Sequence, residues 1–528
     1  MAHSRRRSMR PEAGLESLLH YQPTHSSVED NMKEAVHMLD LLPPDQRKGF
    51  LRLFGQFVQQ RQKPALEWAR LEPPPREAMV QATDIPPCPK DQALRHELLD
   101  KMVILKLNGG LGTSMGCTWP KSAIEVRNDL SFLDLTVRQV EYLNSMYGVD
   151  VPLVLLDSFK THETTAKIIR KYRMHNLTIH TFMQSCHPRI IKDTLQPMPS
   201  GPFGESPPSE WYPPGHGDVY YSLYASGLLE NLINQGKEYI FISNVDNLGA
   251  TVDLDMLYHI FDQEAEFAVE AIERTRADLT GGLVVGYGGK PKVVELSTVP
   301  TERRDQFVKK FNLFNTNNIW ANLRALQRLV AKEEMSLEVN VRERQVSGLK
   351  TIQLETCGAS AIQCFDKVMA IVVNRARYLP VKSTSDLFLV QSNLYGVRHG
   401  SLVMSAERPD GSTPLIKLGR EFTSVEDYLR RIPHGVPTIT QLDHLTVAGD
   451  VMFGENVTLK AGDTFFFHGC CVSCSFAVFR SFLFERFPPD FSAERMYTQG
   501  FCARISALRV GEGLAPRGVA TALAIAGG

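Results

Sequence analysis

The sequence of 528 residues has no apolar run that approaches the roughly 20 residues needed to cross a bilayer. It also has no excess of one charge, since 58 Lys and Arg residues stand against 59 Asp and Glu residues, a net charge of −1. Without a basic surplus, the chain has no global attraction for nucleic acid or for an anionic membrane. We therefore expect no nucleic-acid partner and no membrane partner.

Cysteine is scarce as well. Nine cysteines, an odd number, are spread over the whole chain, which argues against a disulfide framework and for a reducing compartment. Arg5, Arg6 and Arg7 near the start are followed by no apolar stretch, and Glu12 and Glu16 come early, so we expect neither a secretory signal nor a transit peptide. The sequence predicts a cytoplasmic protein.

The length predicts two or three domains. The first 95 residues read as a helical region with a disordered start, because apolar residues recur at helical spacing over 32–42 and 50–58 and prolines follow. Over 96–400, short apolar runs alternate with helical periods. This alternation predicts βαβ units with a parallel sheet, in a doubly wound α/β domain.

The C-terminal part of the chain, from residue 401, contains two segments with different sequence patterns. Three aligned six-residue units over 445–462 resemble rungs of a hexapeptide β-helix, although a meander of strands would show the same pattern. Residues 463–528 lack that periodicity. We therefore divide this part into the start of a β-helix, 401–462, and an atypical tail.

A glycine loop is the sharpest local feature. The apolar strand expected over 102–107 runs into a segment with four glycines within eight residues: Gly109, Gly110, Gly112 and Gly116. Unhindered backbone N–H groups in such a loop converge on an anion, whereas a simple tight turn needs only one or two glycines. The loop has neither the Walker A nor the dinucleotide spacing. Lys121 follows Pro120 soon after it, either as a point charge for phosphate oxygens or as an ordinary surface lysine.

Asp246 ends a second apolar strand, expected over 239–245. Ligands of open α/β sheets gather at the carboxyl ends of strands, and a carboxylate there suits a hard cation that bridges phosphate oxygens. The alternative role, an Asx turn or a helix cap, is the more frequent one for an aspartate in this position.

Two further residues are candidates for anion contacts. His216 lies in a Gly-rich stretch that follows Trp211, and a long loop of this kind inside a compact domain favours a binding loop. The stretch is flexible enough to bring His216 to a ligand, although a lone histidine in a loop is usually just solvated. Lys382 precedes a helix start, where a cation is mildly unfavourable unless an anion binds.

These motifs together resemble the eukaryotic UDP-glucose pyrophosphorylases (UTP–glucose-1-phosphate uridylyltransferases). The matching segments run in the family's order from about 100 to 462: Leu107-Asn108-Gly109-Gly110-Leu111-Gly112-Thr113-Ser114-Met115-Gly116, Pro120-Lys121-Ser122, Trp211-Tyr212-Pro213-Pro214-Gly215-His216-Gly217-Asp218, Ser243-Asn244-Val245-Asp246-Asn247-Leu248-Gly249-Ala250, Phe314-Asn315-Thr316-Asn317-Asn318 and Leu379-Pro380-Val381-Lys382. The resemblance implies a nucleotide-diphospho-sugar transferase-like domain with a mixed sheet, followed by a left-handed β-helix that is incomplete here.

The resemblance also implies a site. The catalytic residues would be Lys382, Lys121 and Asp246, with Asp246 binding Mg²⁺. The substrate-binding set would add Leu107, Asn108, Gly109, Gly110, Gln184, Gly215, His216, Asn244 and Val245. The partners would be UTP, glucose 1-phosphate, UDP-glucose and pyrophosphate, in carbohydrate metabolism that includes glycogen biosynthesis, and the family forms homo-oligomers.

Two departures from the family pattern leave an alternative open. Trp119 stands where the family usually has Gly, so that an indole would crowd the loop and displace Lys121. The tail over 463–528 does not reproduce the family ending, and an unfinished β-helix leaves strand edges unpaired, which puts oligomer assembly in question. The alternative is a catalytically impaired paralogue that binds a UDP-sugar or acts as an oligomer scaffold.

Overall fold

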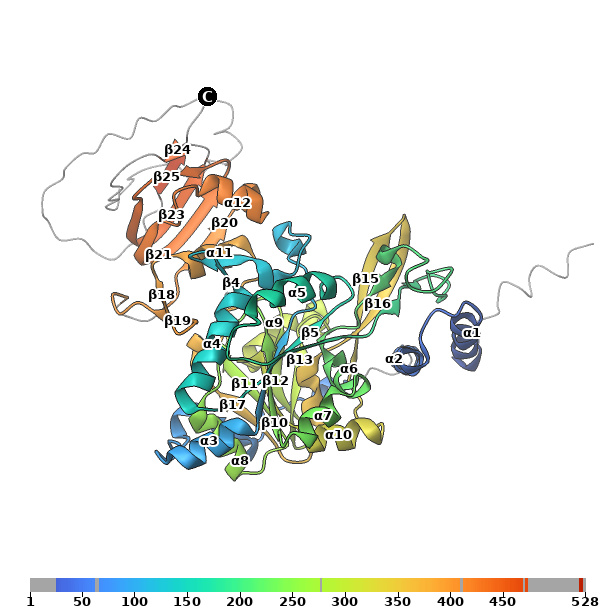
Figure 1. Cartoon of the computed structure of the whole chain (residues 1–528). Helices are drawn as coiled ribbons and strands as arrows, with labels where there is room; N and C mark the ends of the chain where they lie inside the picture. Colours follow the sequence, from blue (N-terminus) through green and yellow to red (C-terminus); the bar gives the residue numbers. More distant parts are fainter. Residues whose placement is uncertain are drawn as a thin grey trace, which may run out of the picture. The chain divides into compact units, whose positions relative to one another are not determined.

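The computed structural model describes residues 25–61, 66–275, 278–408, 412–468, 471–472 and 522–525 (Figure 1). The chain forms two compact units. The smaller unit combines three separate segments, Met1–Trp68, Ser185–Gly215 and Glu338–Thr356, and the larger unit holds the rest of the chain. The tail predicted over 463–528 lies almost entirely outside the described residues.

A ten-stranded sheet forms the centre of the larger unit. Eight of its strands follow the order β1-β17-β11-β14-β10-β2-β5-β6, and β12 and β13 extend it from β14. Their bounds are β1 Met79–Gln81, β2 Met102–Leu107, β5 Leu153–Asp157, β6 Ile179–Met183, β10 Tyr239–Asn244, β11 Phe267–Glu273, β12 Gly282–Tyr287, β13 Lys290–Glu295, β14 Leu313–Asn322 and β17 Val368–Val372.

The sheet is mixed, as the family resemblance implied and contrary to the parallel sheet expected from the alternation of elements. β10, β2, β5 and β6 are parallel neighbours, and so are β11 and β17, but β14 runs antiparallel between β10 and β11. A strand buried on both faces has the same apolar composition in either direction, so its direction is not written in the hydrophobic pattern.

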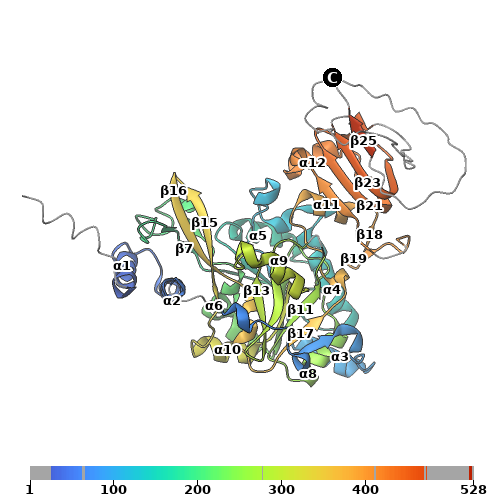
Figure 2. The ribbon, with the colours of Figure 1, turned by 180° about the vertical axis from the view of Figure 1, so that it is seen from behind.

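Helices cover the sheet, as Figure 2 shows from behind. The helices of the larger unit are α3 Gln92–Asp100, α4 Phe132–Tyr147, α5 His162–Ile168, α6 Val219–Ala225, α7 Leu228–Asn234, α8 Leu254–Asp262, α9 Thr301–Lys310, α10 Leu323–Ala331, α11 Thr384–Gln391 and α12 Val425–Arg431. α6 and α7 are two separate helices, because Gly227 between them adopts φ +74°, a left-handed conformation that ends α6.

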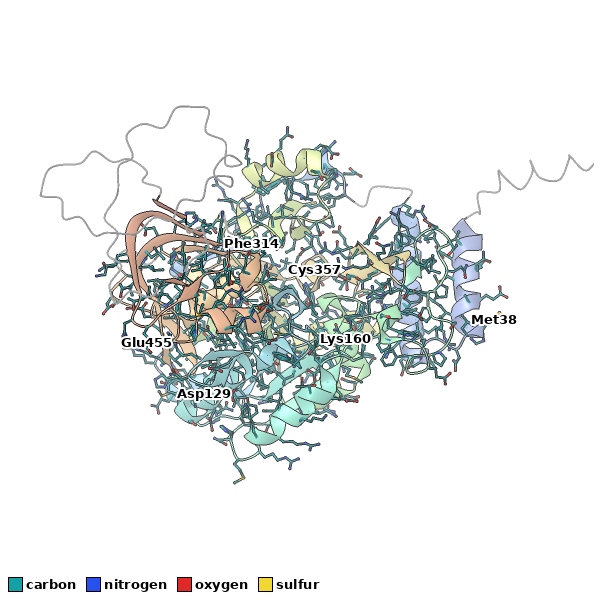
Figure 3. All side chains as sticks on the ribbon, turned by 90° about the horizontal axis from the view of Figure 1, so that it is seen from above. Met38, Asp129, Lys160, Phe314, Cys357 and Glu455 are labelled. Atoms are coloured by element: carbon teal, nitrogen blue, oxygen red, sulfur yellow. The ribbon has the colours of Figure 1, made fainter. Side chains whose placement is uncertain are left out.

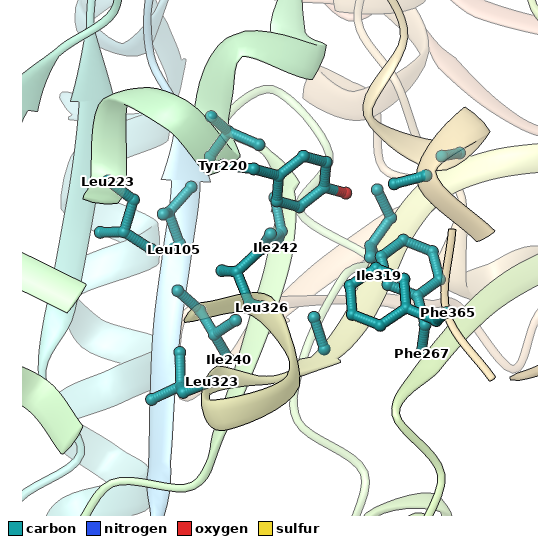
Figure 4. Close-up of a cluster of buried hydrophobic side chains, with 14 of the residues drawn as sticks. Leu105, Tyr220, Leu223, Ile240, Ile242, Phe267, Ile319, Leu323, Leu326 and Phe365 are labelled. Atoms are coloured by element: carbon teal, nitrogen blue, oxygen red, sulfur yellow. The ribbon is translucent and has the colours of Figure 1, made fainter. Parts of the chain in front are cut away.

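The main core lies between one face of the sheet and the helices α6, α7 and α10. Figure 4 shows Leu105, Ile240, Ile242, Phe267 and Ile319 of the strands meeting Tyr220, Leu223, Leu323 and Leu326 of the helices. Side chains alternate between the two faces of a strand, so the residues between these core positions point to the opposite face. That opposite face carries polar and charged residues at several positions.

A second core of the larger unit joins the C-terminal strands to the chain that follows the glycine loop. Met115 and Ile124 pack in one cluster with Phe388 of α11 and with Leu442 and Leu459. The C-terminal strands are β18 Tyr395–Arg398, β19 Ser401–Met404, β20 Leu415–Leu418, β21 Thr438–Ala448, β22 Met452–Phe453, β23 Thr458–His468, β24 Cys471–Val472 and β25 Ala522–Ile525. β20, β21, β23 and β25 pair in parallel, and β22 pairs in parallel with β24, so the meander of antiparallel strands left open by the sequence is not what forms here.

The smaller unit packs two helices on short strands. Its elements are α1 His25–Met38, α2 Pro44–Gln60, β7 His187–Pro188, β8 Ile190–Ile191, β9 Trp211–Tyr212, β15 Val339–Val346 and β16 Leu349–Thr356. The two helices are those expected for the N-terminal region. Phe50, Phe54 and Phe57 of α2 are buried, and the ring of Phe50 meets His187 edge-on at 5.3 Å between centroids. Within the described residues, no helix is both long and apolar enough to cross a membrane.

Candidate functional site

The glycine loop begins where β2 ends, and it lies beside the ends of β5 and β6. The hydroxyl of Ser158 donates to the Gly109 carbonyl at 2.7 Å, and a Cβ built on Gly109 would lie only 2.5 Å from Nε2 of Gln184. The predicted residues Gly109 and Gln184 are therefore neighbours, although 75 positions apart in the numbering. Only glycine allows this approach of the loop to the Gln184 amide.

Asn108 supports the loop from inside the protein. Its side-chain nitrogen Nδ2 donates to Oδ1 of Asp157 at 2.7 Å and to the Thr165 hydroxyl at 2.9 Å. Oδ2 of Asp157 lies 3.1 Å from Nδ1 of His162. Asp157 is fully buried, and burial raises the pKa of its carboxyl group to about 6. Asn108 therefore has a structural task within the loop, a role that its motif alone did not reveal.

Lys121 and Asp246 meet directly. Nζ of Lys121 lies 2.5 Å from Oδ2 of Asp246, and both side chains are largely buried. The Lys121 amide also donates to the Gly110 carbonyl at 3.1 Å, which fastens the lysine to the glycine loop. The predicted phosphate-binding lysine and the predicted metal ligand thus share one place at the carboxyl edge of β2 and β10.

Trp119 does not displace Lys121. Its side chain is 43% exposed, and its carbonyl oxygen accepts a hydrogen bond from the Gly112 amide at 3.4 Å. The expected crowding of the loop is therefore not what this geometry contains, because Lys121 reaches Asp246 with the indole in place.

The segment that carries Lys382 lies against the turn that carries Asp246. Asn247 and Pro380 form an isolated antiparallel bridge, and the Leu379 amide donates to Oδ1 of Asn247 at 2.8 Å. On the other side, the Ser114 hydroxyl donates to the Lys382 carbonyl at 2.9 Å. The exposed Lys382 side chain reaches the Thr280 carbonyl at 3.4 Å. Three segments that are distant in sequence thus converge here.

Asn244 and Val245 lie at the same edge. Asn244 is paired with Leu107 in the register of β10 and β2, and the buried Val245 donates its amide to the Leu107 carbonyl at 3.3 Å. The side chain of Asn317 donates to Oδ1 of Asn244 at 2.9 Å. Among the described residues, Oδ1 of Asn317 has no hydrogen-bond partner although it is buried. A buried acceptor without a partner, here inside β14, calls for an explanation such as a bound water, an ion or a ligand.

His216 is held in one tautomer. Its Nδ1 accepts a hydrogen bond from the Gly358 amide at 3.0 Å, so the neutral ring carries its proton on Nε2. Burial lowers the pKa of the imidazole, which favours this neutral form. Gly358 follows Cys357, which Figure 3 labels, and a Cβ on Gly358 would lie 3.4 Å from Ile319 of β14. His216 therefore offers an N–H donor beside the central sheet.

Gly215 is the one predicted residue that belongs to the smaller unit. It has φ +85°, and a Cβ there would lie 2.6 Å from the Thr356 carbonyl oxygen. Glycine at this position is thus explained by the backbone of the smaller unit itself, without reference to a ligand.

The described residues offer a magnesium ion one carboxylate ligand, Asp246, but not a complete set of protein ligands. No group of three or more His, Cys, Asp or Glu side chains suited to a metal occurs in the part of the chain that the structure describes. Asp246 has one oxygen on Lys121, and no hydrogen bond from a described residue reaches its other oxygen. A single carboxylate oxygen is what Mg²⁺ uses when waters and substrate phosphates supply its other ligands.

Comparisons with known proteins identify the family. The family model described as UTP–glucose-1-phosphate uridylyltransferase matches residues 47–460. UTP–glucose-1-phosphate uridylyltransferase 2 of Dictyostelium discoideum is 48% identical over 412 residues, 78% of this chain and 81% of that protein. The enzyme of Hordeum vulgare is 45% identical over 437 residues, 82% of this chain and 92% of that protein.

A solved structure shares the fold. The UDP-glucose pyrophosphorylase of Leishmania major, crystallised as a point mutant in complex with UDP-glucose, superposes with a TM-score of 0.74 and 29% identity, over 85% of this chain and 98% of the other. The chain belongs to the UTP–glucose-1-phosphate uridylyltransferase family.

Proposed function

We propose that this protein converts UTP and glucose 1-phosphate into UDP-glucose and pyrophosphate. The observation that carries the proposal is the contact between Lys121 and Asp246 beside the glycine loop, with the Lys382 segment against the same turn. The Leishmania protein was crystallised with UDP-glucose, which supports the same ligand for this chain.

The uracil and ribose end of UTP would lie over the glycine loop. Leu107, Asn108, Gly109 and Gly110 would line it, and the Gln184 amide, 8% exposed and beside Gly109, would hydrogen-bond the base. An amide offers both a donor and an acceptor, which matches the edge of uracil.

The phosphates would lie between Lys121, Lys382 and the carboxylate of Asp246. Asp246 would hold Mg²⁺ through its free oxygen, and the ion would neutralise the charge on the triphosphate. A lysine provides a compact charge that follows a phosphate as its geometry changes. When UTP binds, the Lys121 ammonium group would turn part of its hydrogen bonding from Asp246 to a phosphate oxygen.

His216 and the turn from Asn244 to Asp246 would contact the sugar side of the product. Nδ1 of His216 accepts a hydrogen bond from the Gly358 amide. The neutral ring would therefore donate a hydrogen bond from its Nε2–H to the substrate. Gly215 precedes His216 directly and would bring backbone close to the nucleotide.

The chemistry needs little from the protein beyond placement and charge. A phosphate oxygen of glucose 1-phosphate attacks the α-phosphorus of UTP in line, a new P–O bond forms, and the bond to the bridging oxygen breaks as pyrophosphate leaves. The nucleophile is already an anion, so no side chain must take a proton. Lys121 and Lys382 would stabilise the charge that spreads over the α-phosphate and the leaving group.

Several further properties stay proposals. We propose a left-handed β-helix from residue 401 onward, supported by the parallel pairing of β20, β21 and β23. We also propose a catalytic domain over 96–400, a helical region over 1–95, homo-oligomer formation, and a cytoplasmic location, which the free thiols of Cys88, Cys117, Cys186, Cys357 and Cys364 support.

Release of pyrophosphate tests the proposed reaction. Purified protein is given UTP and glucose 1-phosphate with and without Mg²⁺, and in parallel UTP with galactose 1-phosphate. We expect turnover that depends on Mg²⁺ and prefers the glucose ester, and a fall of about 10²–10³ in kcat for Lys121→Met. Lys332→Met, at the end of α10, is the matched control and should keep full activity. Binding of UDP-glucose without any turnover would favour the scaffold instead.

A further inference from the structure

A buried polar network lies under the site, on the face of the sheet opposite the main core. The core side chains of β10, β11 and β14 are Ile242, Val269 and Ile319, and their neighbours Ser243, Glu270 and Asn318 point the other way. Lys106 of β2 joins them, 2% exposed, with Nζ donating to the Ser243 hydroxyl at 2.8 Å. Four adjacent strands therefore place polar groups side by side.

Glu270 is the centre of this network. Its residue is fully buried, and each carboxylate oxygen accepts two hydrogen bonds. Oε1 accepts from Arg377 at 2.6 Å and from Trp320 at 3.0 Å. Oε2 accepts from Arg377 at 2.8 Å and from Asn318 at 2.9 Å. A paired and fully hydrogen-bonded carboxylate is the form in which a buried charge is tolerated.

Arg377 carries this contact to both halves of the site. Its guanidinium also donates to the Thr251 carbonyl at 2.8 Å, in the chain just after the Asp246 turn. Its own carbonyl accepts from Asn247 at 3.1 Å, and Asn247 in turn accepts from the Leu379 amide. The pair of Glu270 and Arg377 therefore clamps the turn and the Lys382 segment onto the sheet.

We propose that Glu270 and Arg377 are positioning residues that act on catalysis through Lys382. The proposal rests on the proposed function, in which Lys382 stabilises the transferring phosphate. Lys382 is exposed and, among the described residues, its Nζ has a single hydrogen bond, 3.4 Å long, to the Thr280 carbonyl, so its own side chain is weakly held. The place of its ammonium group depends on where the backbone from Arg377 to Lys382 is fixed.

The pair of Glu270 and Arg377 matters because the reaction rate depends on where the Lys382 ammonium group lies. A displacement of about 1 Å in a group that stabilises charge can lower a rate about 100-fold, while a uniform substrate contact is changed little. Losing the carboxylate of Glu270 removes the ion pair of the Arg377 guanidinium, leaves it the hydrogen bond to the Thr251 carbonyl, and loosens the segment beside Asn247. The nucleotide contacts at Gly109 and Gln184 follow the ends of β2 and β6, away from β11 in the sheet order.

The test is a double-mutant cycle on the full chain. Glu270→Gln keeps the shape and removes the charge, and we expect kcat to fall about 10- to 100-fold with KM for UTP within a factor of about three. Lys382→Met alone should lower kcat by about 10²–10³. The double variant should be no slower than Lys382→Met, because the clamp acts only through that lysine.

The control is a second Arg–Glu pair, whose glutamate directly precedes β11. Glu266 makes a bidentate pair with Arg328 of α10, at 2.9 and 3.0 Å, and Glu266→Gln should leave kcat unchanged. If Glu270→Gln does not fold, Asn247→Ala cuts the same connection from the turn, and the cycle is run with it.

Each outcome decides the matter. A strong fall in kcat that disappears in the Lys382→Met background supports the proposal. An additive fall in the double variant, a change confined to KM, or an unchanged kcat overturns it while leaving the proposed function intact. A wild-type protein that releases no pyrophosphate overturns the proposed function and this inference with it.

Discussion

Gly109→Ala is the change whose effect follows most directly from the coordinates. The new methyl group would lie 2.5 Å from Nε2 of Gln184, whereas ordinary contact begins at 3.4 Å, so the Gln184 amide must retreat by about 0.9 Å. Gln184 is 8% exposed and its backbone N–H donates to the Asp157 carbonyl at 2.8 Å, so the retreat has to come from its side-chain torsions. The backbone of Gly109 is not in the left-handed region, so alanine adds a clash without adding strain.

The size of the effect follows from the displaced amide. A hydrogen bond of about 2.9 Å from Gln184 to uracil would stretch to about 3.8 Å and be lost. An unmade hydrogen bond at a buried polar group costs about 1–3 kcal/mol, which is about a 5- to 150-fold rise in the KM for UTP or in the Kd for UDP-glucose. kcat should change much less, because the base is remote from the bond that breaks.

Initial rates at varied UTP and calorimetric titration of UDP-glucose measure the two quantities. Gly110→Ala is the comparison, since no atom of the described residues, apart from its two chain neighbours, lies within 4 Å of a Cβ at Gly110, and an effect there would come from the ligand. In a Gln184→Ala background, Gly109→Ala should add little further loss. If Gly109→Ala leaves both constants as in the wild type, or lowers only kcat, the assignment of this corner to the base is wrong.

Three other changes probe separate features. Trp119→Gly should leave kcat and KM within a factor of about two, because Lys121 already reaches Asp246; a several-fold gain in rate would restore the crowding hypothesis. Burial raises the pKa of Asp157 to about 6 from 3.8, so its share of the stability is present below pH 4 and is lost as the pH rises through 6. Asp157→Asn should remove that slope, at most about 3 kcal/mol, from urea unfolding at pH 4 to 7, and an unaltered slope would contradict the assignment. Gly215→Ala forces a side chain into φ +85° and against the Thr356 carbonyl, which should cost the smaller unit at least about 1–2 kcal/mol in thermal unfolding; an unchanged melting temperature would contradict this account of the backbone.

The parts of the site that the sequence predicts are those written in local patterns. An apolar run over 102–107 followed by glycines predicts both β2 and the loop after it, and the strand has those bounds. The position of Asp246 at the end of β10 followed from the same reasoning. The resemblance implies that Asp246 and Lys121 belong to one site, and their direct contact is what the structure adds.

The clamp under the site was not predicted, and the reason is physical. A glutamate inside the apolar strand β11 is a visible anomaly, as is Lys106 inside β2, and such a residue signals a buried partner. The identity of the partner depends on strand order and register, which place Glu270 beside β14 and under Arg377. The hydrophobic periodicity of a single strand reveals neither the strand order nor the register.

The smaller unit shows a related limit. Its segments are separated by more than a hundred residues in the chain, and no local signal connects the helices near the start to the hairpin of β15 and β16. Each segment looks like a loop or an isolated element until its partners are known.

The discontinuity of the smaller unit has a consequence for how the protein is made. Roughly 270 residues separate Trp68 from Glu338, and at about 5–20 residues per second the ribosome needs about 15–55 s to supply them. During that interval α2 lacks the strands β15 and β16 against which it packs, and part of its aromatic face is exposed apolar surface on a nascent chain. We expect chaperones to engage this helix during translation, and the first segment to be made to be among the last to reach its native packing.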